Sequence, residues 1–244
     1  MITLIKFISL AIVTLALNAC QFNSFPFNKG VRGNGVVVSE QRNSDESFNS
    51  IEVSAGIDLF LTQSDSPRIS VQADENIQEL IITEIENETL KIYMDKSTHH
   101  VASKKVVVNF ITIEQIKASS GSDVFSTNTL KVPSLDLSTS SGSEMKLSVE
   151  TQFIDSNSSS GSLITLEGNT KEFIGNASSG SQLNASKLIT EICEVKASSG
   201  ADLSVNCVEE FNASASSGAH IKNYESSIKT SVKSSSGGSI DTKN

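Results

Sequence analysis

The chain has few of the residues from which many binding and catalytic sites are built. Its 244 residues include no Trp, two Tyr and three His. Scarce aromatic rings exclude sugar-stacking platforms built of Trp and Tyr. Three histidines leave little material for a metal centre or a general base. The sequence therefore predicts no catalytic residue, no metal site and no cofactor.

Positive charge and cysteine are also scarce. Lys and Arg number 19 against 28 Asp and Glu, a net charge of −9. This balance argues against nucleic acid as a partner and against a basic membrane-binding face. The three cysteines are too few for a disulfide framework. We expect a fold held together by its core and its backbone ladders.

The first twenty residues, "MITLIKFISLAIVTLALNAC", combine one positive charge, a short apolar run and a lipobox. A run of this length does not span a bilayer core of roughly 30 Å. We therefore expect a lipoprotein signal peptide over 1–19 and lipid attachment at Cys20, with two or more acyl chains giving stable anchoring. The alternative is an ordinary cleaved signal with an incidental cysteine. Residues 20–35 are predicted to be a lipid-anchored tether, and Gln21 favours an outer-membrane lipoprotein, periplasmic or surface-exposed.

What the chain has in abundance is a repeat. The stretch "ASSGSDV" at 118–124 returns six more times as close variants, and its glycines lie 18–21 residues apart, a spacing typical of solenoids. The glycines expected at these structural corners are Gly121, Gly142, Gly161, Gly180, Gly200, Gly218 and Gly237.

Side chains keep one register relative to these glycines. The third residue after each glycine is always large and apolar, from Val124 to Ile240. The fifth and seventh residues before it are mainly apolar, so inward positions alternate with period two, as in strands. We predict an all-β fold, a single-chain parallel β-helix with about 19 residues per coil. An antiparallel sandwich or barrel would not keep one register through seven units, and serine-rich disorder would not keep the apolar positions.

Each Ser-Ser-Gly is predicted to be a corner between two strands. Glycine adopts positive φ without steric cost, and the serine hydroxyls are expected to bind backbone groups that turn out of the ladder. Only small residues occur three before and one after the glycine, which suggests a narrow interior at the bend. A valine at Gly200 is therefore expected to find no room.

The β-helix domain is expected to cover 36–244, with regular repeats over 110–244. The region before the repeats is less regular, but "SIEVSAGIDLFLTQ" matches the repeat around Gly56. Further strands are predicted in "RISVQA", "ELIITEIENETLKIYMD" and "KKVVVNFITIEQI". These strands are expected to form wider coils or a cap, with a turn near Asn87 and Glu88. The last coil has lost most large apolar residues, as expected for the exposed end of a solenoid.

The run "FNSIEVSAGIDLFLTQ", the "ADEN" at 73–76, the "LKIYM" strand and the Ser-Gly-Ser-Asp corners together resemble the family called putative auto-transporter adhesin, head GIN domain. The likeness covers roughly residues 40–225. It implies an exported right-handed parallel β-helix, frequently lipid-anchored, and no established activity. Asn87-Glu88-Thr89 stands where relatives often have a glycine turn.

Two groups of side chains invite chemical hypotheses. Asp123 and Glu144 follow successive corners, so their carboxyl groups are expected near 5 Å apart, a spacing that resembles a retaining glycosidase. A solvated acidic rim is the plainer interpretation. His99 and His100 lie in "DKSTHHVASKK", which is predicted to be a polar loop. Adjacent histidines on a strand would point to opposite faces, and only His220 remains to help either bind a metal.

Cys193 and Cys207 both fall on inward positions of the coil that contains Gly200. They are either a disulfide pair across the coil or two buried thiols, which pack as small apolar residues.

For the whole chain we predict a non-enzymatic interaction module of the cell envelope, membrane-bound through its lipid, whose Ser/Thr-rich face binds a glycan or an envelope protein. The alternatives are an envelope polysaccharide-active enzyme and a purely structural spacer.

Overall fold

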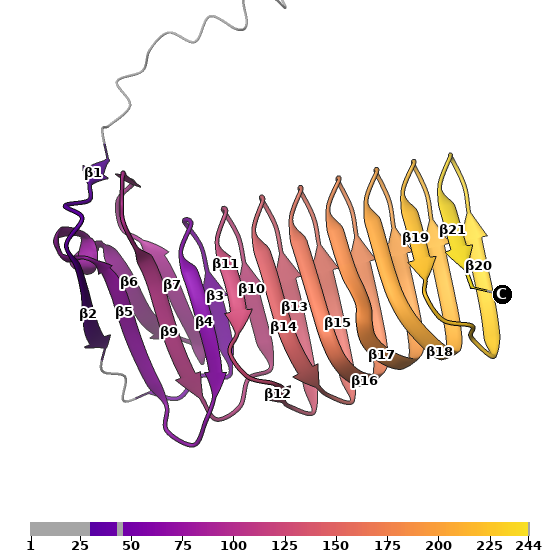
Figure 1. Ribbon diagram of the computed structural model, residues 1–244, viewed down its shortest axis with the longest axis horizontal. Coiled ribbons are helices and arrows are strands. Elements are labelled where there is room, and N and C mark those ends of the chain that lie inside the picture. The colour runs from indigo at the N-terminus through magenta and orange to yellow at the C-terminus, as the bar shows by residue number, and fades with distance from the viewer. Residues whose placement is uncertain (1–29, 43–45, 244) are drawn as a thin grey trace, which may run out of the picture.

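The computed structural model describes residues 30–42 and 46–243 as a stack of β-coils behind an irregular cap (Figure 1). In each regular coil one strand precedes a Ser-Ser-Gly corner and one strand follows it. We call the row of strands after the corners face A and the row before them face B. Face A contains β4 (Asp58–Gln63), β11 (Asp123–Ser126), β14 (Glu144–Glu150), β16 (Leu163–Ala177), β17 (Gln182–Ala197), β18 (Asp202–Ala215), β19 (His220–Asn223) and β21 (Ser239–Thr242).

Face B is built in the same way, and the long strands bend through both faces opposite the corners. Their second halves lie in face B, while the short β12 sits at the wide bend of the first regular coil. Face B contains β3 (Ser50–Val53), β10 (Gln115–Ala118), β13 (Ser134–Thr139), β15 (Phe153–Ser158), the second halves of β16, β17 and β18, and β20 (Lys229–Ser234), with β12 spanning Leu130–Lys131.

Neighbouring coils pair in parallel and in register, which confirms the predicted parallel β-helix. Met145 pairs with Ile164, Ile164 with Leu183, and Leu183 with Leu203. All four side chains are at most 2% exposed. The register shifts only within the wide bends of β16, β17 and β18. Because equivalent side chains lie above one another, the core is a continuous apolar column.

Each corner is a two-residue turn with both central residues in the left-handed region. Ser199 has φ 52° and Gly200 φ 70°, and the N–H of Ala201 donates to the carbonyl of Ser198 at 3.2 Å. Positive φ at both central positions defines a type I′ turn. The sequence predicted a positive φ for the glycine alone, whereas in the structure the serine before it also has a positive φ. A Cβ at Gly200 would meet no atom within 4 Å, so the prediction that this corner has no room is wrong.

The corner hydrogen bonds also differ from the prediction. In the early coils the hydroxyl that binds the backbone belongs to the buried serine after the glycine. Ser143 Oγ donates to the carbonyl of Ala118 at 3.0 Å and accepts from the N–H of Ser140 at 3.2 Å. Ala201 takes this position in a later coil. Coils are further joined by the glycine N–H, which donates to the second serine of the next coil, as from Gly180 to Ser199 at 3.1 Å.

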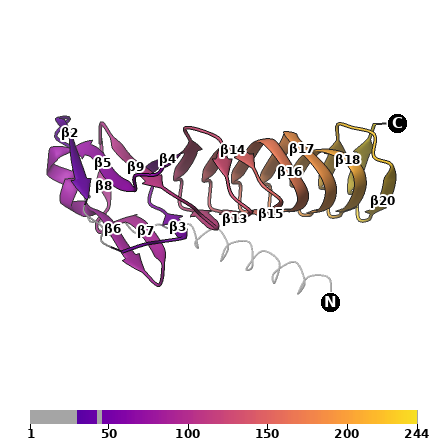
Figure 2. The same cartoon turned by 90° about the horizontal axis from the view of Figure 1, so that it is seen from below.

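The N-terminal cap does not follow chain order. β7 (Thr89–Met94) and β9 (Lys104–Phe110) pair in parallel with β3 and β4, on the side away from the repeats. The coil around Gly56 is therefore inserted between a later coil and the repeats. Beyond it the chain reverses direction: β5 (Arg68–Asp74) pairs antiparallel with β9, β2 (Val37–Arg42) with β5, and β6 (Ile81–Glu86) with β7. These strands close the end of the core (Figure 2).

Two sequence expectations for the cap are settled by its turns. β6 and β7 form a hairpin whose turn residues Asn87 and Glu88 have φ 49° and 59°, so the predicted turn is confirmed without a glycine. The segment "KKVVVNFITIEQI" is two strands, because β9 ends at Phe110 and β10 begins at Gln115.

Polar side chains fasten the cap. Asp74 is fully buried and accepts the N–H of Gly35 at 2.8 Å and those of Ala102 and Ser103 at 2.9 and 3.0 Å. Asn76, in the short 3₁₀ helix η1 (Glu75–Leu80), donates to the carbonyl of Arg32 at 2.8 Å. These bonds hold 31–35, part of the expected tether, on the folded domain. There β1 (Val31–Arg32) pairs with β8 (Thr98–His99).

Burial by itself raises the pKa of Asp74, but the N–H groups of Gly35, Ser103 and Ala102 together hold it below the usual value. The carboxylate is thus ionised and fully paired. The "ADEN" motif that contributes to the family resemblance has a structural role here: its Asp and Asn join residues 32–35 to the cap.

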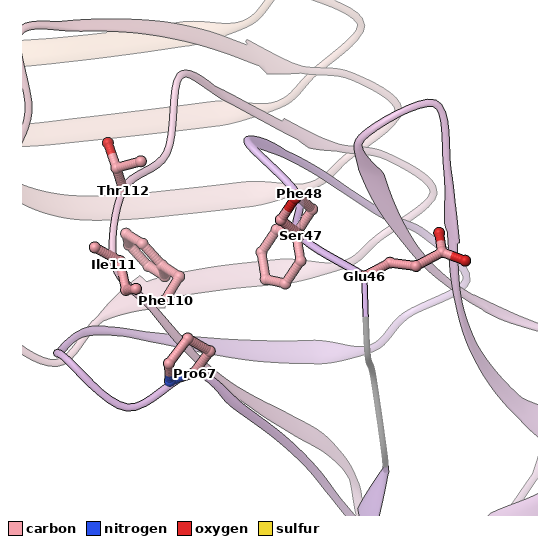
Figure 3. Close-up of a pocket in the computed structure, with 7 residues that line it drawn as sticks. All are labelled: Glu46, Ser47, Phe48, Pro67, Phe110, Ile111 and Thr112. Atoms are coloured by element: carbon pink, nitrogen blue, oxygen red, sulfur yellow. The ribbon is translucent and has the colours of Figure 1, made fainter.

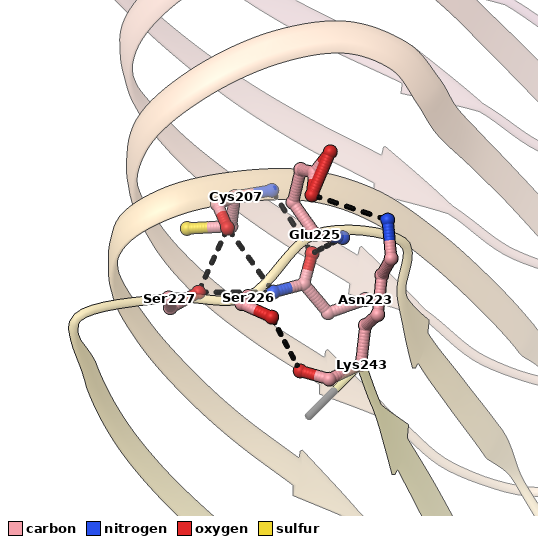
Figure 4. Close-up of polar contacts among 6 residues, drawn as sticks. All are labelled: Cys207, Asn223, Glu225, Ser226, Ser227 and Lys243. Carbon is pink, nitrogen blue, oxygen red and sulfur yellow. Dashed lines mark hydrogen bonds and ion pairs between the residues drawn. The ribbon is translucent and has the colours of Figure 1, made fainter.

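The C-terminal coil is exposed because no coil stacks on it. Every residue of β20 is exposed, and Ile240 in β21 is only half-buried. Side-chain bonds hold this end: Asn223 Oδ1 accepts the N–H of Cys207 at 2.9 Å, and Ser226 donates to the carbonyl of Lys243 at 3.0 Å (Figure 4). Within the described residues no helix is long and apolar enough to cross a membrane.

Candidate interaction surface

The outer surface of face A carries two straight rows of side chains. We number them from the corner glycine: the +2 row is the second residue after it, and the +4 row is the fourth. Because the strands pair in register, members of a row are neighbours about 4.8 Å apart. In order along the stack, the +2 row is Lys105, Asp58, Asp123, Glu144, Leu163, Gln182, Asp202, His220 and Ser239, and the +4 row is Val107, Phe60, Phe125, Lys146, Thr165, Asn184, Ser204, Lys222 and Asp241, with Lys105 and Val107 placed by pairing.

Three carboxylates are consecutive in the +2 row. Asp123 pairs with Asp58 on one side and with Glu144 on the other. The predicted proximity of Asp123 and Glu144 is thus present in the register, and Asp58 extends the row. Burial, with a smaller contribution from the Asp58 carboxylate, raises the pKa of Asp123. The row concentrates negative charge, and among the described residues no group of three or more His, Cys, Asp or Glu is arranged to hold a metal ion.

Two aromatic rings lie beside the carboxylates in the +4 row. Phe60 and Phe125 have ring centroids 5.3 Å apart with an interplanar angle of 34°. The ammonium group of Lys105 lies 4.1 Å from the Phe60 centroid, within range of a cation–π interaction. This pair was not predicted from the sequence, although Gly56 and Gly121 place both residues at +4. Aromatic residues are enriched at binding surfaces, where a polar rim surrounds an apolar centre.

The far end of the same surface is hollowed. Side chains of β17, β18 and β19 together with Tyr224 line a shallow cavity of about 180 Å³. Here His220 Nδ1 lies 3.8 Å from Asp202, and its Nε2 lies 3.1 Å from Asp241. His99 and His100 are at the opposite end of the molecule, in and after β8, with ring centroids 5.3 Å apart. The structure does not bring His220 to them.

A second cavity is apolar and lies outside the two rows. It has a volume of about 420 Å³ and lies where β9 ends. Phe48, Pro67, Phe110 and Ile111 supply its apolar walls, and Glu46, Ser47 and Thr112 complete the lining (Figure 3). The Ile111 side chain is 58% exposed. This cavity fits an apolar group, but nothing in the structure shows what fills it.

Face B also has a shallow hollow, of about 220 Å³, next to the corners. Its lining includes Asn157 and Asn176, which stack in adjacent coils with Asn176 Nδ2 donating to Asn157 Oδ1 at 3.1 Å. Stacked amides of this kind satisfy each other. The hollow is therefore accounted for by the repeat itself.

Cys193 and Cys207 are free thiols with no exposed surface. They lie in hydrogen-bonding contact inside the coil that contains Gly200, and burial strongly raises the pKa of Cys193. Cys207 Sγ also lies 3.2 Å from the carbonyl of Glu210. In this structure the pair packs as two buried thiols. A thiol without solvent contact and with a raised pKa, as Cys193 has, is a poor nucleophile.

The remaining predicted positions divide between corners and the N-terminal segment. The seven corner glycines all have φ between 68° and 78°. The turns that contain them follow one another in a row along the stack of coils (Figure 1). Cys20 and the predicted signal peptide lie outside the described residues.

Comparisons with known proteins agree with this architecture. Residues 47–227 match the family described as putative auto-transporter adhesin, head GIN domain. A comparison with curated proteins finds no match.

Solved structures show the same fold. A putative adhesin from Bacteroides fragilis is 19% identical with a TM-score of 0.81, covering 88% of this chain and 100% of its own. A putative adhesin from Parabacteroides merdae (18%, TM-score 0.72) and a putative lipid binding protein from Parabacteroides distasonis (18%, TM-score 0.68) each cover 88% of this chain and 99% of their own. The chain belongs to the putative auto-transporter adhesin, head GIN domain family, a family of exported or cell-envelope proteins.

Proposed function

We propose that the protein is a cell-envelope lipoprotein that binds an envelope partner or glycan through the outer surface of face A. The observation that carries the proposal is the register of the +2 and +4 rows. It gathers three carboxylates, two phenylalanines and Lys105 into one rigid patch, although packing of the core does not require these side chains. The proposal is also supported by the family, whose name describes an adhesin.

The anchor is proposed from the sequence alone. The lipobox ending at Cys20 would place the acyl chains before the ordered domain, and residues 20–30 would separate the domain from the membrane. Metabolic labelling of the full chain with an alkyne fatty acid should mark the wild type and not Cys20→Ser. The same substitution should release the protein from the outer-membrane fraction. Labelling of Cys20→Ser at the wild-type level would contradict the anchor.

The interaction is tested by comparing the two faces. The full-length protein, purified in detergent, is incubated with envelope fragments from the bacterium that produces it, and the retained fraction is measured. Phe60→Ser with Phe125→Ser should lower retention at least about fivefold, since aromatic residues dominate binding energy at interfaces. A matched pair on the outside of face B, Asn157→Ser with Lys196→Ser, should change it less than twofold. Equal effects of both pairs, or no retention of the wild type, would favour a structural spacer.

One observation favours a second candidate, an envelope polysaccharide hydrolase. Asp123 and Glu144 are paired neighbours, and the pKa of Asp123 is raised, as expected of a general acid. Against it, both carboxyl groups lie on the open outer surface of a sheet rather than in a cleft. Release of new reducing ends from envelope polysaccharide by the wild type, abolished in Asp123→Asn with Glu144→Gln, would establish the enzyme.

A further inference from the structure

The cavity at the C-terminal end of face A has a composition that differs from the rest of the surface. Six of the side chains that line it carry six different polar groups: amide, carboxylate, hydroxyl, imidazole, ammonium and phenol. They come from three adjacent coils and converge because the +2 and +4 rows are in register. These side chains are Asn184, Asp202, Ser204, His220, Lys222 and Tyr224.

Contacts among these groups hold them in place before any ligand arrives. Ser204 Oγ lies 3.0 Å from Asn184 Oδ1 and donates to it. His220 is bracketed by Asp202 and Asp241 at 3.8 and 3.1 Å. Fixed polar groups bind a ligand more tightly than mobile ones because less conformational entropy is lost on binding.

Tyr224 supplies the apolar part of the cavity. Its backbone N–H donates to the carbonyl of Val205 at 2.9 Å, which anchors the residue just after β19. The Lys222 ammonium group lies 4.4 Å from the centroid of the Tyr224 ring, and Tyr224 remains 45% exposed. A fixed, partly exposed phenol combines an apolar face with a polar edge. The scarcity of aromatic residues excludes a platform of several rings, and this site offers one.

The mixture of donors and acceptors selects among ligand classes. An anion would be held mainly by cationic groups, and here Asp202 and Asp241 oppose Lys222. A divalent cation would need several converging oxygen ligands, and no such group of acidic or histidine side chains occurs in the described residues. Hydroxyl groups of a sugar donate and accept at once, and the apolar face of a sugar ring packs on an aromatic ring. The volume, about 180 Å³, lies below the roughly 300 Å³ where drug-sized pockets begin, which suits a single ring.

We propose that this cavity is a binding site for one neutral pyranose unit of a glycan, stacked on Tyr224 and hydrogen-bonded by Asn184, Asp202 and Lys222. The site rests on the proposed function, because it names the ligand class for one end of face A. It leaves the patch at Phe60 and Phe125 free for a different contact.

Saturation-transfer NMR on the full-length protein in detergent tests the site. The probes are the methyl glycosides of glucose, galactose, mannose and N-acetylglucosamine, with glucuronic acid as an anionic comparison. We expect signal for at least one neutral probe and none for glucuronic acid. Tyr224→Ala should weaken binding about tenfold, the loss typical of removing a central aromatic, whereas Tyr224→Phe should retain most of it. Asn157→Ser, on the outside of face B, should leave binding within twofold.

Two results would overturn the site: no signal from any neutral probe, or signal that Tyr224→Ala does not change. Melting curves of each variant establish that the fold is intact. Retention on envelope fragments separates this proposal from the function on which it rests. If the sugars fail but the protein is still retained through Phe60 and Phe125, the glycan site is wrong and the interaction module stands. If retention by the wild type also fails, the proposed function is wrong as well.

Discussion

The cap and the repeats both enclose a β-core, but different interactions stabilise the two regions. In the repeats, stability comes from identical backbone turns and from apolar side chains stacked in register, and polar contacts either stay within one coil or join adjacent coils. In the cap, strands run in both directions, and single polar side chains reach across long stretches of sequence. Asp74 alone bonds to residues 39 and 28–29 positions away.

The difference shows what a repeat can and cannot supply. A coil in the middle of the stack is covered by its neighbours on both sides, so one pattern suffices for all of them. An end has only one neighbour and needs its own solution. The N-terminal end is closed with antiparallel strands and a buried carboxylate, whereas the C-terminal end is left polar and exposed.

The largest expected effect separates a covered coil from the end coil at one repeat position. Leu203→Ala should lower the free energy of unfolding by about 2–5 kcal/mol, because a large side chain buried in the stack leaves a cavity. Ile240→Ala removes the equivalent residue in the last coil and should lower it by about 1 kcal/mol or less. Urea denaturation measures both. Equal losses would mean that the last coil is covered in solution.

The second prediction concerns the cap. Asp74→Asn should destabilise the protein by about 2–3 kcal/mol, because an amide nitrogen would then face a backbone N–H where a carboxylate now accepts. Asp65→Asn, in an exposed turn, is the matched control and should stay within about 0.5 kcal/mol.

The pH dependence of this effect has a definite sign. Since the folded pKa of Asp74 lies below its usual value, its contribution is fully present above the unfolded pKa of about 3.9 and is lost as pH falls through the folded value. The gap between wild type and Asp74→Asn should therefore narrow below about pH 4. A gap independent of pH down to pH 2 would contradict the ionised assignment.

The smallest expected effect tests the corners. Gly200→Ala should cost about 1–2 kcal/mol, the strain of a left-handed alanine, because the added methyl group meets open space. Ser199→Asn creates the Asn-Gly pair preferred in type I′ turns and should leave stability unchanged or slightly higher. Both are measured by thermal melting. Loss of folding in Gly200→Ala would mean that the corner is crowded after all.

The repeats could be predicted from sequence because their order in space is their order in the chain. Val124, Met145 and Ile164 recur at one offset, and only vertical stacking explains that. The arrangement of the cap strands could not be predicted, because no local feature of residues 89–110 indicates that these strands pair with β3 and β4 on the side away from the repeats. The left-handed serines were missed because glycine alone accounts for a turn when only residue types are visible.

The positions of the surface residues could also be predicted only in part. Asp58 and Phe60 follow Gly56 at the repeat offsets, so their place beside Asp123 and Phe125 was available from the sequence. Tyr224 was not, because it stands past the last residue of β19, where the bend departs from the repeat. Its position depends on how that bend lies against β18.

The hydrogen bond from a corner glycine N–H to the serine carbonyl of the following coil sets a fixed spacing between coils, so the length of the molecule depends on the number of coils. An in-frame duplication or deletion of one repeat would change the distance between the cap and the exposed end by a single rung, with both ends unchanged. The length of such a protein is therefore a property that evolution can adjust in fixed steps, without redesigning a core.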